Sequence, residues 1–411
     1  MKKRILALLM AGALALGLTA CGGGDTSTDA DTTADSSSDT AATTGIAADK
    51  LKVGLILVGE AADAYNKNHI DGMREACQKN GMDYDSQVVV KANITEDSTC
   101  ADAINELLDA GCNAIFADSF GHEQYMEEAA PDHPDVQFCH ATGYQGATDT
   151  LDNTHNYFAK IFEARYLAGI AAGLKTETNK LGYVAAKPFA EVISGYTAFY
   201  LGAKSVCPSV TMKVQFVGSW SDATEEANAA SALCDAGCVM ISQHSDNTTP
   251  APMAQTKGAF HTGYNNDMTG VAPDASLIGT RIDWAPYFEY AIETVYNGGT
   301  IDQDWCKGIA DGSVVMTTLN EKICAKGTAE KVAEVEKALK DGTLQVFDTS
   351  KFTVKGETVT HAFALDTDGD FTPDAEEAVF DGAFHESYFQ SAPYFTLQID
   401  GIEWLNSAYG N

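Results

Sequence analysis

Short runs of hydrophobic residues alternate along the chain with stretches that are apolar on one helical face. The continuous run Leu51–Val58 is typical of a buried parallel strand. The pattern then predicts a helix at His69–Asn80, a strand at Val88–Val90, a helix at Asp97–Asp109 and a strand at Ala114–Phe116. Strands that alternate with helices predict an α/β fold with a doubly wound parallel sheet.

The same order of elements occurs twice. The tetrapeptide Asp-Ala-Gly-Cys stands at Asp109–Cys112 and again at Asp235–Cys238, each time before an apolar run. Upstream, Leu51–Ile56 has a counterpart in Lys180–Ala185 at a similar distance. This repetition predicts two similar doubly wound lobes joined by a hinge.

Loops at the carboxyl ends of parallel strands form the ligand site in open α/β sheets. Two such lobes would face each other across a cleft and close on a ligand by hinge motion. The predicted loops are Gly59–Asn68 and Asp118–His122 in the first lobe, and Lys187–Glu191, Ser219–Asp222, Gln243–Thr249 and Tyr264–Met268 in the second.

The first residues combine three basic side chains, Lys2, Lys3 and Arg4, with the uncharged apolar stretch Ile5–Ala20, which is followed by Cys21. This segment resembles a bacterial lipoprotein signal that is cleaved before Cys21, whose thiol then carries a diacylglyceryl group. An ordinary secretory signal with a chance cysteine is the alternative. The resemblance implies a protein held on the extracytoplasmic face of the cell membrane through its lipid alone.

These boundaries divide the chain into four parts. Residues 1–20 form the signal peptide, and residues 21–49, which hold no aromatic side chain, form a lipidated flexible tether. We expect residues 51–175 plus about 284–320 in lobe 1, and residues 178–282 plus about 325–411 in lobe 2.

Charge and motif content exclude several classes of function. The chain has 26 basic and 58 acidic residues and a net charge of −32, which repels nucleic acid. It contains no phosphate-binding glycine loop, no nucleophile elbow and no H-E-x-x-H zinc motif. We therefore predict a binding protein, not an enzyme.

Nine cysteines follow Cys21 in an exported chain, where disulfides can form. Cys306 and Cys324 are the best local candidates for a pair, and buried free thiols are the alternative for most of the nine.

One acidic segment has the spacing of a calcium-binding loop. Oxygen ligands stand at its positions 1, 3, 5, 7, 9 and 12, but its glycine is at position 4 and Phe371 occupies position 6. An acidic turn in a solvated loop is the alternative. Because the segment lies outside the repeated lobes, we expect that loss of a calcium site there leaves ligand binding mostly intact. The candidate calcium ligands are Asp366, Asp368, Asp370, Thr372, Asp374 and Glu377.

Five segments resemble the basic membrane protein (BMP) family, which comprises substrate-binding lipoproteins of ATP-driven (ABC) importers. The segments are Gly182–Gly195, Gly218–Asp222, Gln243–Pro250, Gly263–Met268 and Arg281–Tyr287. The resemblance implies a type I periplasmic-binding-protein fold, a purine-class ligand and ABC permease subunits as partners. We expect a monomer. Another small polar solute such as a sugar, or an extracellular ligand sensor, remains the alternative.

Several ligand-binding positions follow from this resemblance. Aromatic rings would flank a flat ligand, and polar groups would bind its edge. For Tyr65 and Phe120 the alternative is plain packing in the core. For Asp267 the alternative is capping of the next turn. The candidates are Tyr65, Asn66, Ser119, Phe120, Phe189, Trp220, Asp246, Asn247 and Asp267.

Trp284 completes the predicted site. In nucleoside-binding relatives a lysine follows the strand that leads back into the first lobe, and aligning Arg281–Asp283 with that strand places Trp284 at the lysine position. An indole there would fill the volume of a ribose and leave its hydroxyls unpaired. This alignment predicts that free purine bases bind better than nucleosides.

Overall fold

The computed structural model describes residues 45–146 and 150–406. The predicted signal peptide, the lipidation site Cys21 and the tether as far as residue 44 lie outside the described residues. Within the described part, no helix is both long and apolar enough to cross a membrane.

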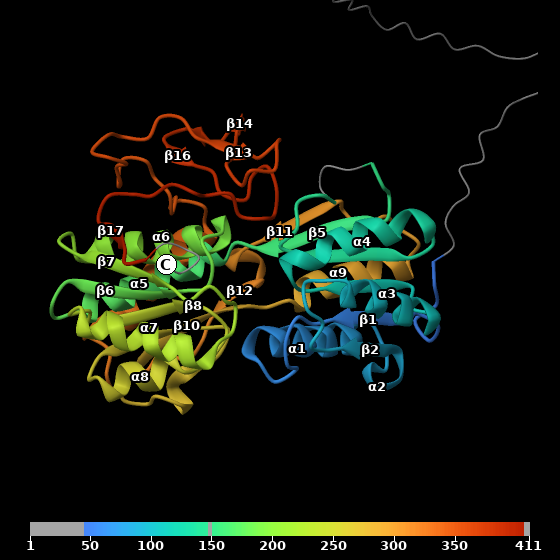
Figure 1. The fold of residues 1–411 in the computed structure, drawn as a ribbon, viewed down its shortest axis with the longest axis horizontal. Helices are drawn as coiled ribbons and strands as arrows, with labels where there is room; N and C mark the ends of the chain where they lie inside the picture. Colours follow the sequence, from blue (N-terminus) through green and yellow to red (C-terminus); the bar gives the residue numbers. More distant parts are fainter. Residues whose placement is uncertain (1–44, 147–149, 407–411) are drawn as a thin grey trace, which may run out of the picture. The chain divides into compact units, whose positions relative to one another are not determined.

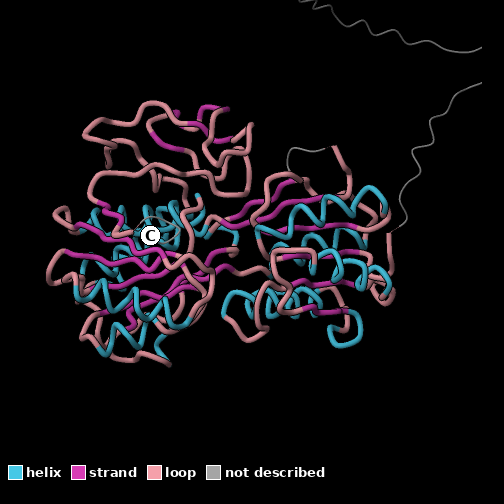
Figure 2. The backbone as a smooth tube through the Cα atoms, viewed as in Figure 1, coloured by secondary structure: helices cyan, strands magenta, loops and turns pink. Residues whose placement is uncertain are grey.

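Lobe 1 is a six-stranded sheet in which all neighbouring strands are parallel (Figures 1 and 2). Helices α1 (Ala64–Lys79) and α9 (Ala285–Tyr296) cover one face, and α3 (Thr99–Asp109) and α4 (Glu123–Ala129) cover the other. The short α2 (Tyr84–Gln87) precedes the edge strand. The strand order is β11 (Asp304–Lys307), β5 (Thr154–Ala159), β4 (Gln137–Ala141), β3 (Ala114–Ala117), β1 (Val53–Ile56) and β2 (Val88–Lys91).

Lobe 2 is a seven-stranded sheet that is parallel except for one edge strand, β12. Helices α5 (Ile161–Lys175) and α6 (Ala190–Val206) pack on one face, and α7 (Ala223–Asp235) and α8 (Pro250–Thr256) pack on the other. The strand order is β12 (Val314–Met316), β10 (Ser276–Ile282), β9 (Phe260–Tyr264), β8 (Met240–His244), β6 (Lys180–Ala185), β7 (Thr211–Phe216) and β17 (Ile402–Trp404). The predicted fold class, two doubly wound α/β lobes, is confirmed.

The repeated tetrapeptide is the end of a helix in both lobes. Gly111 follows α3 with φ 81°, and Gly237 follows α7 with φ 88°. Only glycine adopts this left-handed conformation without steric cost. In each copy the next residue, Cys112 or Cys238, donates its backbone N–H to a leucine carbonyl in the last helical turn at 3.1 Å. The motif therefore stops the helix and starts the following buried strand.

Helix α5 belongs to lobe 2, although residues 161–175 were expected in lobe 1. It packs along α6 and against β10, and α10 (Thr328–Lys340) packs on it in turn. The helix is apolar nearly all round, so the sequence pattern did not show which sheet it would cover. The return to lobe 2 also comes earlier than the expected residue 320, because β12 already pairs with β10.

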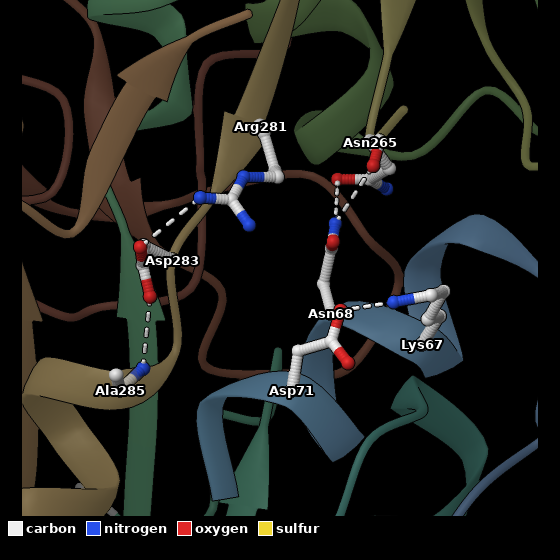
Figure 3. A network of polar contacts seen from close by, with 7 residues as sticks. All are labelled: Lys67, Asn68, Asp71, Asn265, Arg281, Asp283 and Ala285. Carbon is white, nitrogen blue, oxygen red and sulfur yellow. Dashed lines mark hydrogen bonds and ion pairs between the residues drawn. The ribbon is translucent and has the colours of Figure 1, made fainter. Parts of the chain in front are cut away.

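The described chain passes between the lobes three times, after β5, after β10 and after β11. Backbone hydrogen bonds tie these crossings together: Lys160 N–H donates to the Lys307 carbonyl at 2.9 Å, and Asp283 N–H donates to the Ser313 carbonyl at 2.9 Å. The Asp283 carboxylate also accepts from Ala285 N–H at 3.2 Å and pairs with Arg281 at 3.2 Å (Figure 3). These contacts make the crossings a defined hinge.

The segment that follows α10 forms small pairs of strands outside the two main sheets, drawn in orange and red in Figure 1. Its core consists of stacked and edge-on rings of Phe347, Phe384 and Phe395. The strands are β13 (Phe363–Leu365), β14 (Ala375–Glu377), β15 (Val379–Phe380) and β16 (Ala383–Phe384). Short 3₁₀ turns lie at η1 (Phe120–His122), η2 (Ala130–Asp132), η3 (Met268–Gly270) and η4 (Ile309–Asp311).

The expected disulfide between Cys306 and Cys324 is not formed, and the nine cysteines of the described part are all free. Cys306 lies in β11 of lobe 1, whereas the Cys324 thiol contacts the Leu277 carbonyl in β10 of lobe 2. The chain crosses the hinge between Cys306 and Cys324, so the two residues lie in different lobes although they are close in sequence.

Candidate functional site

A small cavity lies where the strand-end loops of the two lobes meet. We call it the inner cavity, and it encloses about 30 Å³. Six lining residues come from lobe 1 and five from lobe 2, so both lobes would enclose a ligand bound there. The lining residues are Val58, Tyr65, Asp118, Ser119, Phe120 and Thr142 of lobe 1, and Glu191, Trp220, His244, Asp246 and Tyr264 of lobe 2.

Aromatic side chains from both lobes line the inner cavity. Tyr65 and Phe120 come from lobe 1, and Trp220 and Tyr264 come from lobe 2. The Tyr65 hydroxyl donates to the Asp118 carbonyl at 2.8 Å, which fixes its ring at the start of α1. The Trp220 carbonyl accepts from Asp246 N–H at 2.8 Å, which joins two loops of lobe 2. Flat faces from both lobes suit a planar ligand.

Three carboxyl groups supply polar edges to the same space, namely those of Asp118, Glu191 and Asp246. Burial raises the pKa of Asp118 well above its usual range, and one of its oxygens accepts from Val58 N–H at 2.9 Å. Asp246 keeps part of its surface open to the cavity, but burial, and then the negative charge of Glu226, raise its pKa well above the usual range. A carboxyl that keeps its proton offers one donor and one acceptor side by side.

The Arg165 guanidinium stands behind the Tyr264 wall of the inner cavity. None of the described residues that line the cavity is a lysine or an arginine. His244 contacts a Glu191 oxygen at 3.1 Å, but burial, and then the charge of Arg165, lower its pKa to about 4. Arg165 itself is fully buried, with its guanidinium carbon 3.8 Å from the centre of the Tyr264 ring. The cavity surface therefore favours ligands that donate hydrogen bonds.

An ion pair between the lobes lies beside the aromatic residues of the inner cavity. The Lys187 amine of lobe 2 lies 3.4 Å from a Glu96 oxygen of lobe 1, and 5.3 Å from the centre of the Trp220 ring. Glu96 also accepts from Ser119 Oγ at 2.7 Å and from Gly121 N–H at 3.0 Å. Burial alone would raise the pKa of Glu96, but these hydrogen bonds and the lysine charge hold it below its ordinary value.

The structure places five of the predicted ligand-binding residues at the inner cavity: Tyr65, Ser119, Phe120, Trp220 and Asp246. Phe189 lies next to them, with its ring centre 5.5 Å from that of Phe120 and 6.0 Å from that of Trp220. These residues belong to separate loops. The expectation that loops at the carboxyl ends of the strands form one site was sufficient to identify them.

Besides Phe189, four predicted residues do not line the inner cavity. Asp267 is exposed and caps η3, where it accepts from Thr269 N–H at 3.0 Å. Asn66 is buried and donates to the Glu60 carbonyl at 2.9 Å. Asn247 stabilises its own loop by accepting from Thr249 N–H at 3.1 Å. In these three residues the polar groups named above form hydrogen bonds with residues close by in the sequence. The fourth residue is Trp284.

Trp284 is part of the lobe 1 core. It is 1% exposed and stacks on His69 with ring centres 4.3 Å apart, and its edge faces Tyr157 at 5.4 Å. Tyr65 stands at 6.2 Å from it, on the cavity side. The prediction that Trp284 fills a ribose position is therefore wrong, because α9 begins directly after it and turns the indole under the sheet.

Sequence reasoning missed other cavity residues: Val58, Asp118, Thr142, Glu191, His244 and Tyr264. Asp118, Glu191, His244 and Tyr264 stand in the loops that the strand pattern marked, and their position directly after a strand or before a helix was the available signal. Thr142 follows β4, a strand that the hydrophobic pattern did not predict.

The acidic loop is only partly arranged as a calcium loop. The carboxylates of Asp366, Asp368 and Asp370 gather within 4.8 Å of one another. Asp374 instead accepts from the Thr367 hydroxyl at 2.9 Å, Glu377 pairs with His361 at 2.9 Å, and Thr372 N–H donates to Asp370 at 2.8 Å.

The acidic loop lies outside the repeated elements of the two lobes, and the expectation that ligand binding survives loss of its calcium site stays a prediction. The loop borders a larger space of about 480 Å³, which we call the outer cavity. The outer cavity shares Phe120, Thr142, Glu191 and Trp220 with the inner one.

Comparisons with known proteins agree with this architecture. A family model described as ABC transporter substrate-binding protein PnrA-like matches residues 50–348. A purine-binding protein of Brucella abortus is 34% identical over 73% of this chain and 84% of its own length. A putative ABC transporter glucose-binding protein of Haloferax volcanii is 34% identical over 58% of this chain and 60% of its own length.

More distant relatives cover more of the chain or share the fold alone. An ABC transporter nucleoside-binding protein of Lactococcus lactis is 24% identical over 86% of this chain and 99% of its own length. The solved structure of an ABC transporter solute-binding protein from Conexibacter woesei covers 72% of this chain and 98% of its own, with a TM-score of 0.61 and 18% identity. With a matching family model over most of its length and a two-lobed cleft, the chain belongs to the family of PnrA-like ABC transporter substrate-binding proteins.

Proposed function

We propose that this protein binds a purine outside the cytoplasm and delivers it to the permease subunits of an ABC importer, with free bases favoured over nucleosides. In this proposal Cys21 carries the lipid that holds the monomeric protein at the membrane.

The observation that carries the purine proposal is the combination of rings and carboxyl groups around the inner cavity. Tyr65, Phe120 and Trp220 offer flat faces from two sides, and Asp118 and Asp246 offer polar edges between them. A purine base is flat and has N–H donors next to ring-nitrogen acceptors at its edge. A protonated carboxyl matches such an edge with its own donor and acceptor.

The preference for free bases needs a new argument, since Trp284 lies in the core. The inner cavity opens toward an outer cavity whose surface is mostly apolar. A ribose placed there would have to bury hydroxyl groups with few partners, at about 1–3 kcal/mol for each unpaired group. A free base requires no such burial and keeps an additional ring N–H for a carboxyl group.

A sugar is the second candidate. One relative is named as a putative glucose-binding protein, and sugars also stack on aromatic rings and donate hydrogen bonds to carboxylates. A sugar, however, donates and accepts hydrogen bonds all around its ring, whereas four of the eleven residues that line the inner cavity are aromatic. The two candidates therefore differ in the ligand that the purified protein should retain.

The test begins with mass spectrometry of small molecules released from the denatured protein. Calorimetric titrations of ligand-free protein with adenine, guanine, hypoxanthine, adenosine and glucose then rank the candidates. We expect a purine base to bind most tightly and Trp220→Ala to weaken it at least tenfold. Tighter binding of glucose would replace the purine by a sugar, and tighter binding of adenosine would reverse the preference for bases.

A further inference from the structure

The outer cavity has its own set of aromatic walls, drawn from three parts of the chain. Phe120 and Tyr144 come from lobe 1 and stack with ring centres 6.3 Å apart. Phe189 and Trp220 come from lobe 2. Phe371 and Tyr394 come from the C-terminal segment, and Phe371 stacks on Phe189 at 6.1 Å.

The C-terminal side of this cavity extends beyond the part of the chain that the family model matches. That match ends at residue 348, whereas twelve lining residues lie in the stretch from Ala364 to Thr396. Phe371 reaches the cavity from the acidic loop with φ 64°, a left-handed conformation that is strained for a bulky residue, and its side chain is 64% exposed. Its ring nevertheless lies 6.5 Å from Phe120 of lobe 1 and 6.1 Å from Phe189 of lobe 2.

The two cavities form one continuous site with two different surfaces. Phe120, Thr142, Glu191 and Trp220 line both, so a ligand held between Tyr65 and Trp220 would have one edge facing the outer cavity. The inner part is small and bordered by carboxyl groups, and the outer part is about 480 Å³ and mostly apolar. A ligand that fills both must have a donor-bearing head and an apolar extension.

We propose that the outer cavity is a second subsite that binds an apolar, preferably aromatic, substituent on the purine, and that the C-terminal segment builds its outer wall. This proposal rests on the proposed purine function for the identity of the head group. The apolar subsite itself rests only on the outer cavity, which allows the two to be tested separately.

The first experiment compares adenine with two substituted forms, 6-benzylaminopurine and 9-benzyladenine, by calorimetry. The two isomers carry the same ring at opposite ends of the base, so one of them directs it into the outer cavity whichever way the base lies. We expect one isomer to bind about tenfold more tightly than adenine, because its ring leaves water for an apolar surface. If neither isomer gains affinity over adenine, the proposal is wrong.

Variants locate the gain in affinity. Ala392→Phe places a ring into the outer cavity, and Phe371→Ala removes an exposed ring from its wall without disturbing a core. Both should bring the affinity ratio of the better isomer to adenine close to one. Phe363→Ala is the matched control, because Phe363 is also exposed on the C-terminal segment but lines neither cavity, and it should keep the wild-type ratio. Thermal unfolding of each variant verifies that it folds.

A fragment tests the subsite without any purine. Ligand-observed NMR with benzyl alcohol should detect binding to the wild-type protein and to Phe363→Ala, and much weaker binding to Ala392→Phe. Failure of adenine to bind while the fragment still distinguishes these variants would overturn the purine head group and leave the apolar subsite intact. Fragment binding that is the same in all three proteins would overturn the subsite.

Discussion

The side-chain amide of Asn68 in α1 donates a hydrogen bond to the backbone carbonyl of Asn265, which follows β9 in the other lobe, at 3.0 Å (Figure 3). Both residues are buried. Asn265 has φ 55°, a left-handed conformation that asparagine tolerates better than most residues. The bond joins residues 197 positions apart and stands close to the hinge crossing at Asp283, which Figure 3 shows in the same view.

Asn68→Ala should weaken ligand binding about three- to tenfold, because a bond between the lobes stabilises only the closed state that holds the ligand. Calorimetric titration with adenine measures the loss, and solution scattering of the ligand-free variant should show a larger radius of gyration. Lys67→Ala is the matched control, since the neighbouring Lys67 is exposed and pairs with Asp71 of its own helix. An unchanged affinity in Asn68→Ala would mean that this bond does not contribute to closure.

Asp246 should bind the purine edge as a neutral carboxyl group. Burial and the nearby negative charge of Glu226 raise its pKa, so Asp246→Asn, which keeps one donor and one acceptor, should retain most of the affinity for adenine. Asp246→Ala should lose at least tenfold. Wild-type affinity should fall as the pH rises through the raised pKa, and Asp246→Asn should remove this dependence.

Asp267→Ala is the control for Asp246, because its carboxylate caps η3 outside the cavity. Adenine affinity in this variant should equal that of the wild type in the same titration. A tenfold loss in Asp267→Ala together with no loss in Asp246→Ala would restore the assignment that the family resemblance suggested.

Much of the fold could be predicted from the sequence, because buried parallel strands are nearly continuous apolar runs. The run Leu51–Val58 contains β1, and the repeated Asp-Ala-Gly-Cys marks two helix ends whose glycines require positive φ. The start of α1 was missed by five residues. Its first turns carry Asn66 and Asn68, which read as part of a polar loop but are buried and hydrogen-bonded in the structure.

The site could be predicted only in part, since the strand-end rule identifies loops but not the direction of each side chain. Asp246 and Asp267 both follow strands of lobe 2, yet one reaches the cavity and the other caps a turn. The role of the C-terminal segment was not predictable, because Phe371 meets Phe189 through contacts between residues far apart in sequence.

Glu386 should make the protein less stable as the pH rises. It is 6% exposed, and burial raises its pKa from 4.5 to about 8. Between these values the unfolded chain is ionised while the folded chain keeps the proton, so stability is full below about pH 4.5 and is lost as the pH rises through 8. Glu226, with a pKa of about 7, and Asp304, with a pKa of about 6, act in the same direction.

Glu386→Gln should therefore raise the free energy of unfolding at pH 9 by on the order of 5 kcal/mol, with little change at pH 4. Urea unfolding at both pH values measures this difference. The exposed Glu357→Gln is the control and should change neither value. An equal effect of Glu386→Gln at pH 4 and pH 9 would assign it to packing instead of ionisation.

Calcium binding by the acidic loop remains a prediction. The gathered carboxylates of Asp366, Asp368 and Asp370 should give heat in a calorimetric titration of chelator-treated protein at calcium concentrations up to millimolar. Asp368→Asn should remove that heat. Absence of any heat in the wild type would show that the segment is a solvated acidic turn.

Substitution of Trp220 should mainly affect ligand binding, whereas substitution of Trp284 should mainly affect stability. Trp220 is half-buried at the inner cavity, so Trp220→Ala should weaken adenine binding while changing the free energy of unfolding little. Trp284 is 1% exposed and packed against His69 and Tyr157, so Trp284→Ala should cost about 3–5 kcal/mol of stability. Trp284→Lys should destabilise still more, because it buries a charge in the same core, and it should not shift the preference toward nucleosides. Chemical unfolding and parallel titrations with adenine and adenosine measure both properties in each variant. A folded Trp284→Lys protein that prefers adenosine would place the indole in the ligand site after all.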